Sequence, residues 1–72
     1  MNILVNGRNY NWSNPTITYD DVVCIAEQPH YASVIYQGAK KDGTRTGGIL
    51  YGDKVIDVEE GMIFTAVPTG NA

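Results

Sequence analysis

The side chains most often used for nucleophilic catalysis and zinc binding are scarce in this chain of 72 residues, which has one cysteine, Cys24, and one histidine, His30. A reactive thiol needs an exposed, electropositive setting, and the neighbouring Asp20 and Asp21 argue against one. We therefore predict that Cys24 packs as a small core residue of a helix. His30 follows Pro29 in a predicted turn and has no evident partner, so we predict a solvated loop residue.

A single cysteine cannot form an internal disulfide, and no cluster of cysteine and histidine offers a zinc site. We expect no catalytic residues, no metal site and no cofactor. A domain of this size buries only about 60% of the surface of its unfolded chain. Its stability must therefore come from packing, or partly from self-association into a homo-oligomer.

The C-terminal segment, residues 59–72, holds the other arrangement that could take part in chemistry. Gly61 permits a tight turn, residues 62–67 have the apolar and β-branched character of a buried strand, and Pro68 ends a strand because it has no N–H to donate. The tail that follows carries no charged side chain and consists of Thr69, Gly70, Asn71 and Ala72. Such a tail would present the C-terminus to the active site of another protein, while a frayed end without a role is the alternative.

The charge balance and the apolar pattern exclude several classes of protein. The net charge is -3, with eight acidic against five basic residues, which argues against a nucleic-acid partner. No apolar run approaches eighteen residues, so we expect no membrane span. The N-terminus lacks a basic segment followed by an apolar one, so we expect no signal peptide and a soluble, cytoplasmic protein.

The first half of the chain predicts a hairpin followed by a helix. Residues 3–5 and 9–12 have strand character and flank Asn6-Gly7, a strong hairpin signal because both residues tolerate positive φ. Thr18 and Asp21 are spaced as a capping box, so we predict a helix of about ten residues from Thr18, ended by Pro29. The short helix must gain its stability mainly by packing on a sheet.

The second half predicts further strands. Residues 32–36 form a third strand with Val34 and Ile35 on opposite faces. Residues 37–48 predict a long mobile loop or an extended hairpin, and residues 49–51 and 55–58 predict short strands. If the final strand lies between the first and the third, its almost continuous apolar character is explained. We therefore predict an α+β domain over residues 1–72, with a mixed four- to five-stranded sheet packed on one short helix.

The chain resembles the ubiquitin-like superfamily, and within it the small bacterial ubiquitin-like modifiers and the multiubiquitin-type domains. The resemblance rests on residues 5–12, 17–23 and 58–64, with a similar tail at 68–72. It implies the β-grasp fold, a protein modifier without catalytic activity of its own, and an extended C-terminal tail. In bacteria such modifiers are encoded beside their own enzymes, in some cases in antiphage defence.

The resemblance also implies the chemistry at the C-terminus. An adenylating, or activating, enzyme uses ATP at a C-terminal glycine carboxylate, a thioester forms, and a conjugating enzyme transfers the acyl group to an amine or another nucleophile of a target protein. The chain has Thr69-Gly70 in place of two glycines, and Asn71-Ala72 follow. We therefore expect Gly70 to be the activated residue, after a processing or deconjugating peptidase removes Asn71-Ala72.

Two further sets of site residues follow from the resemblance. Partners of ubiquitin-like proteins bind an exposed apolar sheet face, here predicted to hold Ile35, Ile63 and Thr65 if Phe64 faces the helix; an Ile35 without a binding role is the alternative. Possible acceptors for a second copy are three lysines, for which solvated charge is the favoured alternative: Lys40, Lys41 and Lys54. Gly47-Gly48 resembles a cleavage or activation site in its two residue types alone. Because it lies inside the chain, in a predicted loop, we predict that it provides flexibility.

Two other functions stay open at this point. A sulfur carrier of cofactor biosynthesis would use the same adenylated glycine and end in a thiocarboxylate, but such carriers usually end in Gly-Gly. A non-conjugated interaction or oligomerisation module would have a silent tail and use its sheet face or an edge strand.

Overall fold

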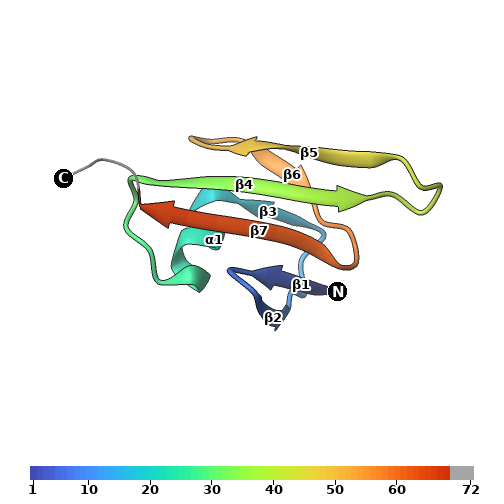
Figure 1. The fold of residues 1–72 in the computed structure, drawn as a ribbon, viewed down its shortest axis with the longest axis horizontal. Helices are drawn as coiled ribbons and strands as arrows, with labels where there is room; N and C mark the ends of the chain where they lie inside the picture. Colours follow the sequence, from blue (N-terminus) through green and yellow to red (C-terminus); the bar gives the residue numbers. More distant parts are fainter. Residues whose placement is uncertain (69–72) are drawn as a thin grey trace.

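The computed structural model describes residues 1–68, and its main element is a five-stranded sheet (Figure 1). The strand order across the sheet is β2-β1-β7-β4-β5. The bounds of these strands are Asn2–Val5 for β1, Arg8–Asn11 for β2, Ala32–Ala39 for β4, Arg45–Leu50 for β5 and Met62–Pro68 for β7. A single helix, α1, spans Tyr19–Ala26.

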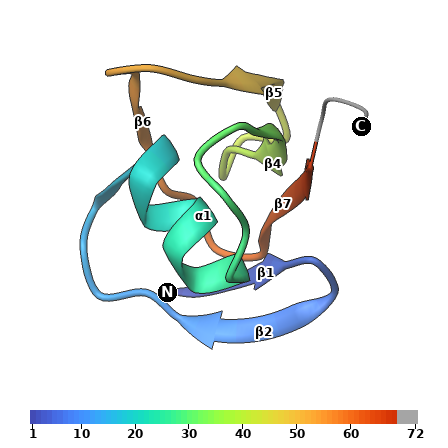
Figure 2. The same cartoon turned by 90° about the vertical axis from the view of Figure 1, so that its left-hand side faces the viewer.

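The sheet is mixed, because β1 and β7 are parallel while β2 with β1, β4 with β7 and β5 with β4 are antiparallel. The final strand lies between β1 and β4, as the sequence predicts, and its Phe64 is completely buried. Figure 2 shows α1 inside the curve that the sheet forms. One helix on one face of a mixed sheet with the last strand at its centre is the β-grasp arrangement, so the predicted fold class is confirmed.

The hairpin of β1 and β2 follows the Asn6-Gly7 signal. Asn6 has φ 51 and Gly7 has φ 82, so both turn residues adopt the left-handed conformation that tight hairpins require. The turn leaves Val5 opposite Arg8. Trp12, predicted as the end of the second strand, lies one residue beyond β2, and its indole N–H donates to the Thr16 carbonyl at 2.9 Å.

The helix begins at the predicted capping box and ends earlier than predicted. The Asp21 N–H donates to Thr18 Oγ1 at 3.2 Å, and the Thr18 N–H donates to the Asp21 carboxylate at 3.0 Å. The helix has eight residues instead of about ten. Glu27 ends it by adopting the left-handed conformation, with φ 56, and its N–H donates to the Cys24 carbonyl at 3.2 Å. The chain has therefore turned before it reaches Pro29.

The stretch from 37 to 48 is an extended hairpin, so the alternative of a long mobile loop is wrong. β4 continues to Ala39, β5 begins at Arg45, and the intervening turn is closed by the Lys40 N–H, which donates to the Thr44 carbonyl at 2.8 Å. The prediction of flexibility at Gly47-Gly48 is also wrong, because both glycines are paired in β5. A Cβ at Gly48 would lie 3.1 Å from the hydroxyl of Tyr36, so this glycine makes room for the ring.

A second, two-stranded sheet pairs β3, Thr16–Thr18, with β6, Val55–Asp57. The sequence predicts 16–17 only as a connection, because three residues are too short to show a strand period. The pairing brings Ile17, which is fully buried, over one end of the helix-covered core. Within residues 1–68, twelve buried apolar residues form one cluster: Ile3, Val5, Ile17, Val22, Val23, Ala32, Val34, Leu50, Val58, Met62, Phe64 and Ala66.

Cys24 does not belong to this core, so its prediction as a buried residue is wrong. Val22 and Val23 are fully buried, whereas Cys24 is exposed. Successive helix residues are rotated by about 100° about the helix axis. Because Val22 and Val23 face the sheet, the next residue, Cys24, points away from it. Within residues 1–68 no helix is long and apolar enough to cross a membrane.

Candidate interaction surface

The uncovered face of the sheet follows from alternation along β7. Met62, Phe64 and Ala66 are buried against the helix side, whereas Ile63 and Val67 are exposed. Because successive strand side chains point to opposite faces, Ile63, Thr65 and Val67 share the outer face. A strand at the centre of a sheet thus carries apolar residues on both of its faces.

The neighbouring strands extend this face. Ile35 of β4 lies opposite Thr65 of β7 and opposite Ile49 of β5. The exposed apolar residues on the three strands are Ile35 (45% exposed), Ile49 (57%), Ile63 (42%) and Val67 (48%). We name these four residues the outer apolar face. Polar side chains border it, since Gln37 is opposite Ile63 and Ser33 is opposite Val67.

The structure brings together the three predicted surface residues, because Ile35, Ile63 and Thr65 lie on the same face of adjacent strands. Sequence reasoning missed Ile49 and Val67. The signal for Ile49 was the extended hairpin, because a continuous pairing of β4 with β5 sets Ile49 opposite Ile35. The alternation of β7 was the signal for Val67.

The three predicted acceptor lysines are exposed but differ in their surroundings. Lys40 and Lys41 lie in the turn between β4 and β5. Lys54 precedes β6, and its ammonium donates to the Ile49 carbonyl at 3.4 Å. The same ammonium lies 5.6 Å from the ring centre of Tyr36 and 5.7 Å from that of Tyr51. Lys54 is therefore partly engaged within its own chain.

The turn that carries Lys40 and Lys41 is held by a local hydrogen bond. The Thr44 N–H donates to Asp42 Oδ1 at 2.8 Å. This bond to the Thr44 backbone lowers the pKa of the Asp42 carboxyl from its ordinary value of 3.8, and a bond with the Thr44 side chain lowers it further. The Gly43 N–H also donates to the Lys40 carbonyl at 2.9 Å, so the turn has a defined shape.

The predicted tail begins where β7 ends. Pro68 closes β7 opposite Ala32, three positions along the strand from the pairing of Thr65 with Ile35. The outer apolar face is therefore close to the point at which the chain leaves the sheet. The residues predicted for processing and activation lie outside the described residues: Thr69, Gly70, Asn71 and Ala72.

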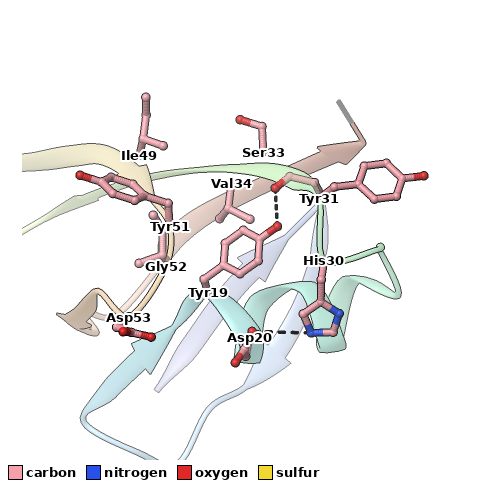
Figure 3. Close-up of a pocket in the computed structure, with 12 residues that line it drawn as sticks. Tyr19, Asp20, His30, Tyr31, Ser33, Val34, Ile49, Tyr51, Gly52 and Asp53 are labelled. Carbon is pink, nitrogen blue, oxygen red and sulfur yellow. Dashed lines mark hydrogen bonds and ion pairs between the residues drawn. The ribbon is translucent and has the colours of Figure 1, made fainter. Parts of the chain in front are cut away.

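A groove at this end of the sheet was not predicted from the sequence (Figure 3). It has a volume of about 550 Å³ and lies between the start of α1, the start of β4 and the turn after β5. Tyr19 crosses it, and its hydroxyl donates to the Ala32 carbonyl at 2.5 Å. His30 Nε2 lies 3.6 Å from Asp20 Oδ1, so the exposed histidine has a partner that sequence reasoning did not find.

The side chains known for metal binding do not gather in the described part of the chain. Among residues 1–68, no three histidine, cysteine, aspartate or glutamate side chains come close enough to hold a metal ion. The surface features of these residues are instead the outer apolar face, the lysine-bearing turn and the groove.

A known protein family matches this chain. A family model described as multiubiquitin matches residues 1–70. The chain belongs to the multiubiquitin family. The match covers every strand, the helix and the first two residues after β7, and the observed β-grasp sheet agrees with a ubiquitin-like domain. Searches of the curated proteins and of the solved structures gave no match.

Proposed function

We propose that the chain is a ubiquitin-like protein modifier that is attached to target proteins through the carboxylate of Gly70, after a peptidase removes Asn71-Ala72. The observation that carries the proposal is the family match, which extends two residues beyond β7 and ends at Gly70. The β-grasp fold supports it, because the central strand leads directly into the tail.

The chemistry belongs to the partner enzymes. The Gly70 carboxylate attacks the α-phosphorus of ATP in an adenylating enzyme and releases pyrophosphate. A cysteine thiolate then displaces AMP to form a thioester, and an amine or another nucleophile of the target displaces the thiol through a conjugating enzyme. The modifier needs only a small residue at its end, because the backbone must approach the nucleotide closely. It supplies no catalytic group.

The outer apolar face is the surface that we assign to these enzymes. Its four exposed aliphatic side chains are bordered by polar residues, which is typical of a docking site. It also lies near the end of β7, so an enzyme bound there could receive the tail. Lys40 and Lys41 are the exposed acceptors for a second copy, while Lys54 is partly engaged with two tyrosine rings.

The decisive experiment is intact mass spectrometry of the chain purified from its native host. We expect a species that lacks Asn71 and Ala72, together with heavier conjugates joined through Gly70. A truncated species with one oxygen replaced by sulfur would instead identify a sulfur carrier. If only the full chain is found while its enzymes are present, the modifier function is wrong and an interaction module explains the fold better.

Two matched chains sharpen this test. One chain ends at Gly70 and so lacks Asn71-Ala72. The other ends at Thr69 and also lacks Gly70. Each is expressed in the native host. We expect conjugates with the first chain, because it bypasses the peptidase, and none with the second. Equal conjugation of both chains would assign the attachment to another residue. The identity of the genes beside the coding sequence tests whether the chain acts in a bacterial conjugation system, including one of antiphage defence.

A further inference from the structure

The groove beside the start of α1 carries negative charge on an aromatic surface. Asp20 enters it from the helix and Asp53 from the turn after β5, while Tyr51 and Ile49 supply exposed apolar surface (Figure 3). None of the described residues that line it is lysine or arginine, and its one basic side chain is His30, whose Nε2 lies 3.6 Å from Asp20 Oδ1. Lys54 follows Asp53 in the chain, and its ammonium lies at the edge of the groove, where it donates to the Ile49 carbonyl and faces the Tyr51 ring. Within residues 1–68 it forms no ion pair with Asp20 or Asp53. A long basic side chain fits such a groove, because its stem packs on apolar surface and its charged end meets carboxylates.

The matching positive surface is on the same chain. Three of the five lysine and arginine residues of the chain lie within residues 40–45, at the turn between β4 and β5: Lys40, Lys41 and Arg45. All three are exposed. The hydrogen bonds that involve Asp42 and Thr44 give the turn its defined shape, so the lysines are presented from a preformed support. Figure 1 shows this turn projecting beyond the other strands.

The groove cannot receive the turn of its own chain. The groove is lined by the first residues of β4, whereas the turn follows the last residue of β4. Five strand residues, 35–39, lie between the groove and the turn, so Val34 and Lys40 are about 20 Å apart at roughly 3.3 Å per residue. The molecule is elongated, with extents of 42 × 21 × 21 Å, and Figure 1 places the groove end and the turn at opposite ends of its long axis. A contact between them must therefore join two molecules.

We propose that a second copy of this chain inserts its Lys40-Lys41 turn into the groove formed by Asp20 and Asp53. The interface joins two different surfaces, so one copy of a pair keeps an unused groove and the other an unused turn, and the contact can repeat head to tail. The attraction is mainly electrostatic and the contact is small, so we expect a weak association that salt reduces. Ala32 lines the groove and pairs with Pro68, which puts the inserted lysines at the end of the sheet where the tail begins.

Sedimentation velocity of the full chain alone tests this contact. We expect the average sedimentation coefficient to rise with protein concentration near 0.01 M NaCl, and the rise to disappear near 1 M NaCl, where the Debye length has fallen from about 30 Å to about 3 Å. A groove variant, Asp20→Asn with Asp53→Asn, and a turn variant, Lys40→Glu with Lys41→Glu, should each weaken association by at least about tenfold. Asp57→Asn and Arg8→Glu make the same kinds of charge change, each at one position outside both surfaces, and should associate like the parent.

Mixing the two variants gives the sharpest result. The groove variant keeps an intact turn and the turn variant keeps an intact groove, so one functional contact remains between unlike molecules. We expect the mixture to form a 1:1 dimer that grows no further, although each variant alone is monomeric. Symmetric pairing of like surfaces would give no such recovery.

Several results would overturn the proposal. These are a parent that does not associate at any concentration, an association that persists in both variants, and a mixture of the variants that stays monomeric. If the parent is monomeric but a tetralysine peptide shifts the NMR signals of groove residues, the occupant is a different basic protein. If association is insensitive to salt and is lost with Ile35→Ser, copies meet through the outer apolar face instead. Because no enzyme is present, these results leave the conjugation at Gly70 untouched.

Discussion

Asn6 and Ala66 are joined by two hydrogen bonds although they lie 60 positions apart in the sequence. The Asn6 side-chain amide donates to the Ala66 carbonyl at 3.0 Å, and the Ala66 N–H donates to Asn6 Oδ1 at 2.8 Å. The backbone N–H of Asn6 also donates to the Phe64 carbonyl at 3.0 Å. One turn residue therefore continues the pairing of β1 with β7 beyond the end of β1, and it fixes the central strand two residues before Pro68.

Replacing Asn6 separates its side-chain bonds from its backbone conformation. Asn6→Gly keeps the positive φ but loses both side-chain bonds, so we expect a loss of about 2 kcal/mol in unfolding free energy, at about 1 kcal/mol per bond. Asn6→Ala should cost a further 1 kcal/mol or so because an alanine disfavours the left-handed conformation. Urea unfolding measures both changes, and hydrogen exchange of the Ala66 amide should accelerate.

Asn14→Gly is the control for the Asn6 variants, since Asn14 lies in an exposed bend outside the sheet. We expect it to leave the exchange rate of the Ala66 amide unchanged. If Asn6→Gly is as stable as the parent, the paired hydrogen bonds do not hold the end of β7.

The Asn6-Gly7 turn also marks how far sequence reasoning reaches. The two residue types predict the positive φ angles and the hairpin, because those depend on neighbours in the chain. The capping box of Thr18 and Asp21 is predictable for the same reason. The bonds from Asn6 to Ala66 were not predictable, because they depend on the parallel register of β1 with β7. Local chemistry is readable in this chain, whereas the register that brings distant segments together is not.

The errors have a similar origin. Cys24 was predicted to be buried from its apolar neighbours, but the face that a helix of eight residues buries is fixed by how the helix sits on the sheet. Gly47 and Gly48 suggested flexibility, yet they are strand residues opposite a large ring. The groove was missed because Asp20 and Asp53 are distant in the sequence and line one groove only through the arrangement of α1 and the turn after β5.

Gly38 lies where the ends of three side chains come close together, those of Glu59, Met62 and Thr46. A Cβ at this position would lie 2.9 Å from Glu59 Oε1 and 3.2 Å from the terminal methyl of Met62. The same Glu59 oxygen accepts a hydrogen bond of 2.9 Å from the Thr46 hydroxyl. We expect Gly38→Ala to lower the unfolding free energy by about 1 kcal/mol, the lower end for overpacking, because the side-chain ends can move aside but this hydrogen bond is disturbed.

A double-mutant cycle identifies the cause of the Gly38→Ala loss. In a Glu59→Ala background the nearest atom is gone, so Gly38→Ala should cost clearly less than in the parent. Gly48→Ala is the comparison variant, because its added methyl meets the end of the Tyr36 ring, at 3.1 Å from the hydroxyl. Equal costs of Gly38→Ala in the two backgrounds would show that Glu59 is not the obstacle.

The Asp42 carboxyl should titrate below its ordinary pKa of 3.8, because the Thr44 backbone N–H stabilises its charged form. A pKa lowered in the folded state contributes stability that is present above the unfolded pKa and is lost as the pH falls through the folded pKa. The turn should therefore loosen only in strong acid. An NMR titration of the Asp42 side-chain carbon measures the midpoint directly.

Thr44→Ala tests the causes assigned to the Asp42 pKa. It removes the side-chain hydrogen bond, which is the second cause, and keeps the backbone N–H, which is the first. We expect the pKa of Asp42 to rise toward 3.8 without reaching it. A midpoint at or above 3.8 in the parent chain would contradict the hydrogen bond between Asp42 and Thr44.

Neighbouring positions of β7 should separate surface function from stability. Ile63 is 42% exposed on the outer apolar face, so Ile63→Ser should change the unfolding free energy by no more than about 0.5 kcal/mol, as is usual for surface sites. Phe64, the next residue, is completely buried, and Phe64→Ala should cost about 3–5 kcal/mol.

If enzymes bind the outer apolar face, Ile63→Ser and Ile35→Ser should reduce conjugates in the native host while urea unfolding stays close to that of the parent. Arg8→Ser is the control, because Arg8 is exposed on β2, outside the outer apolar face as defined, and is not a predicted acceptor. Conjugates that persist at parental levels in both isoleucine variants would assign enzyme binding to another surface, and a loss of stability in Ile63→Ser comparable to that of Phe64→Ala would make this face part of the core.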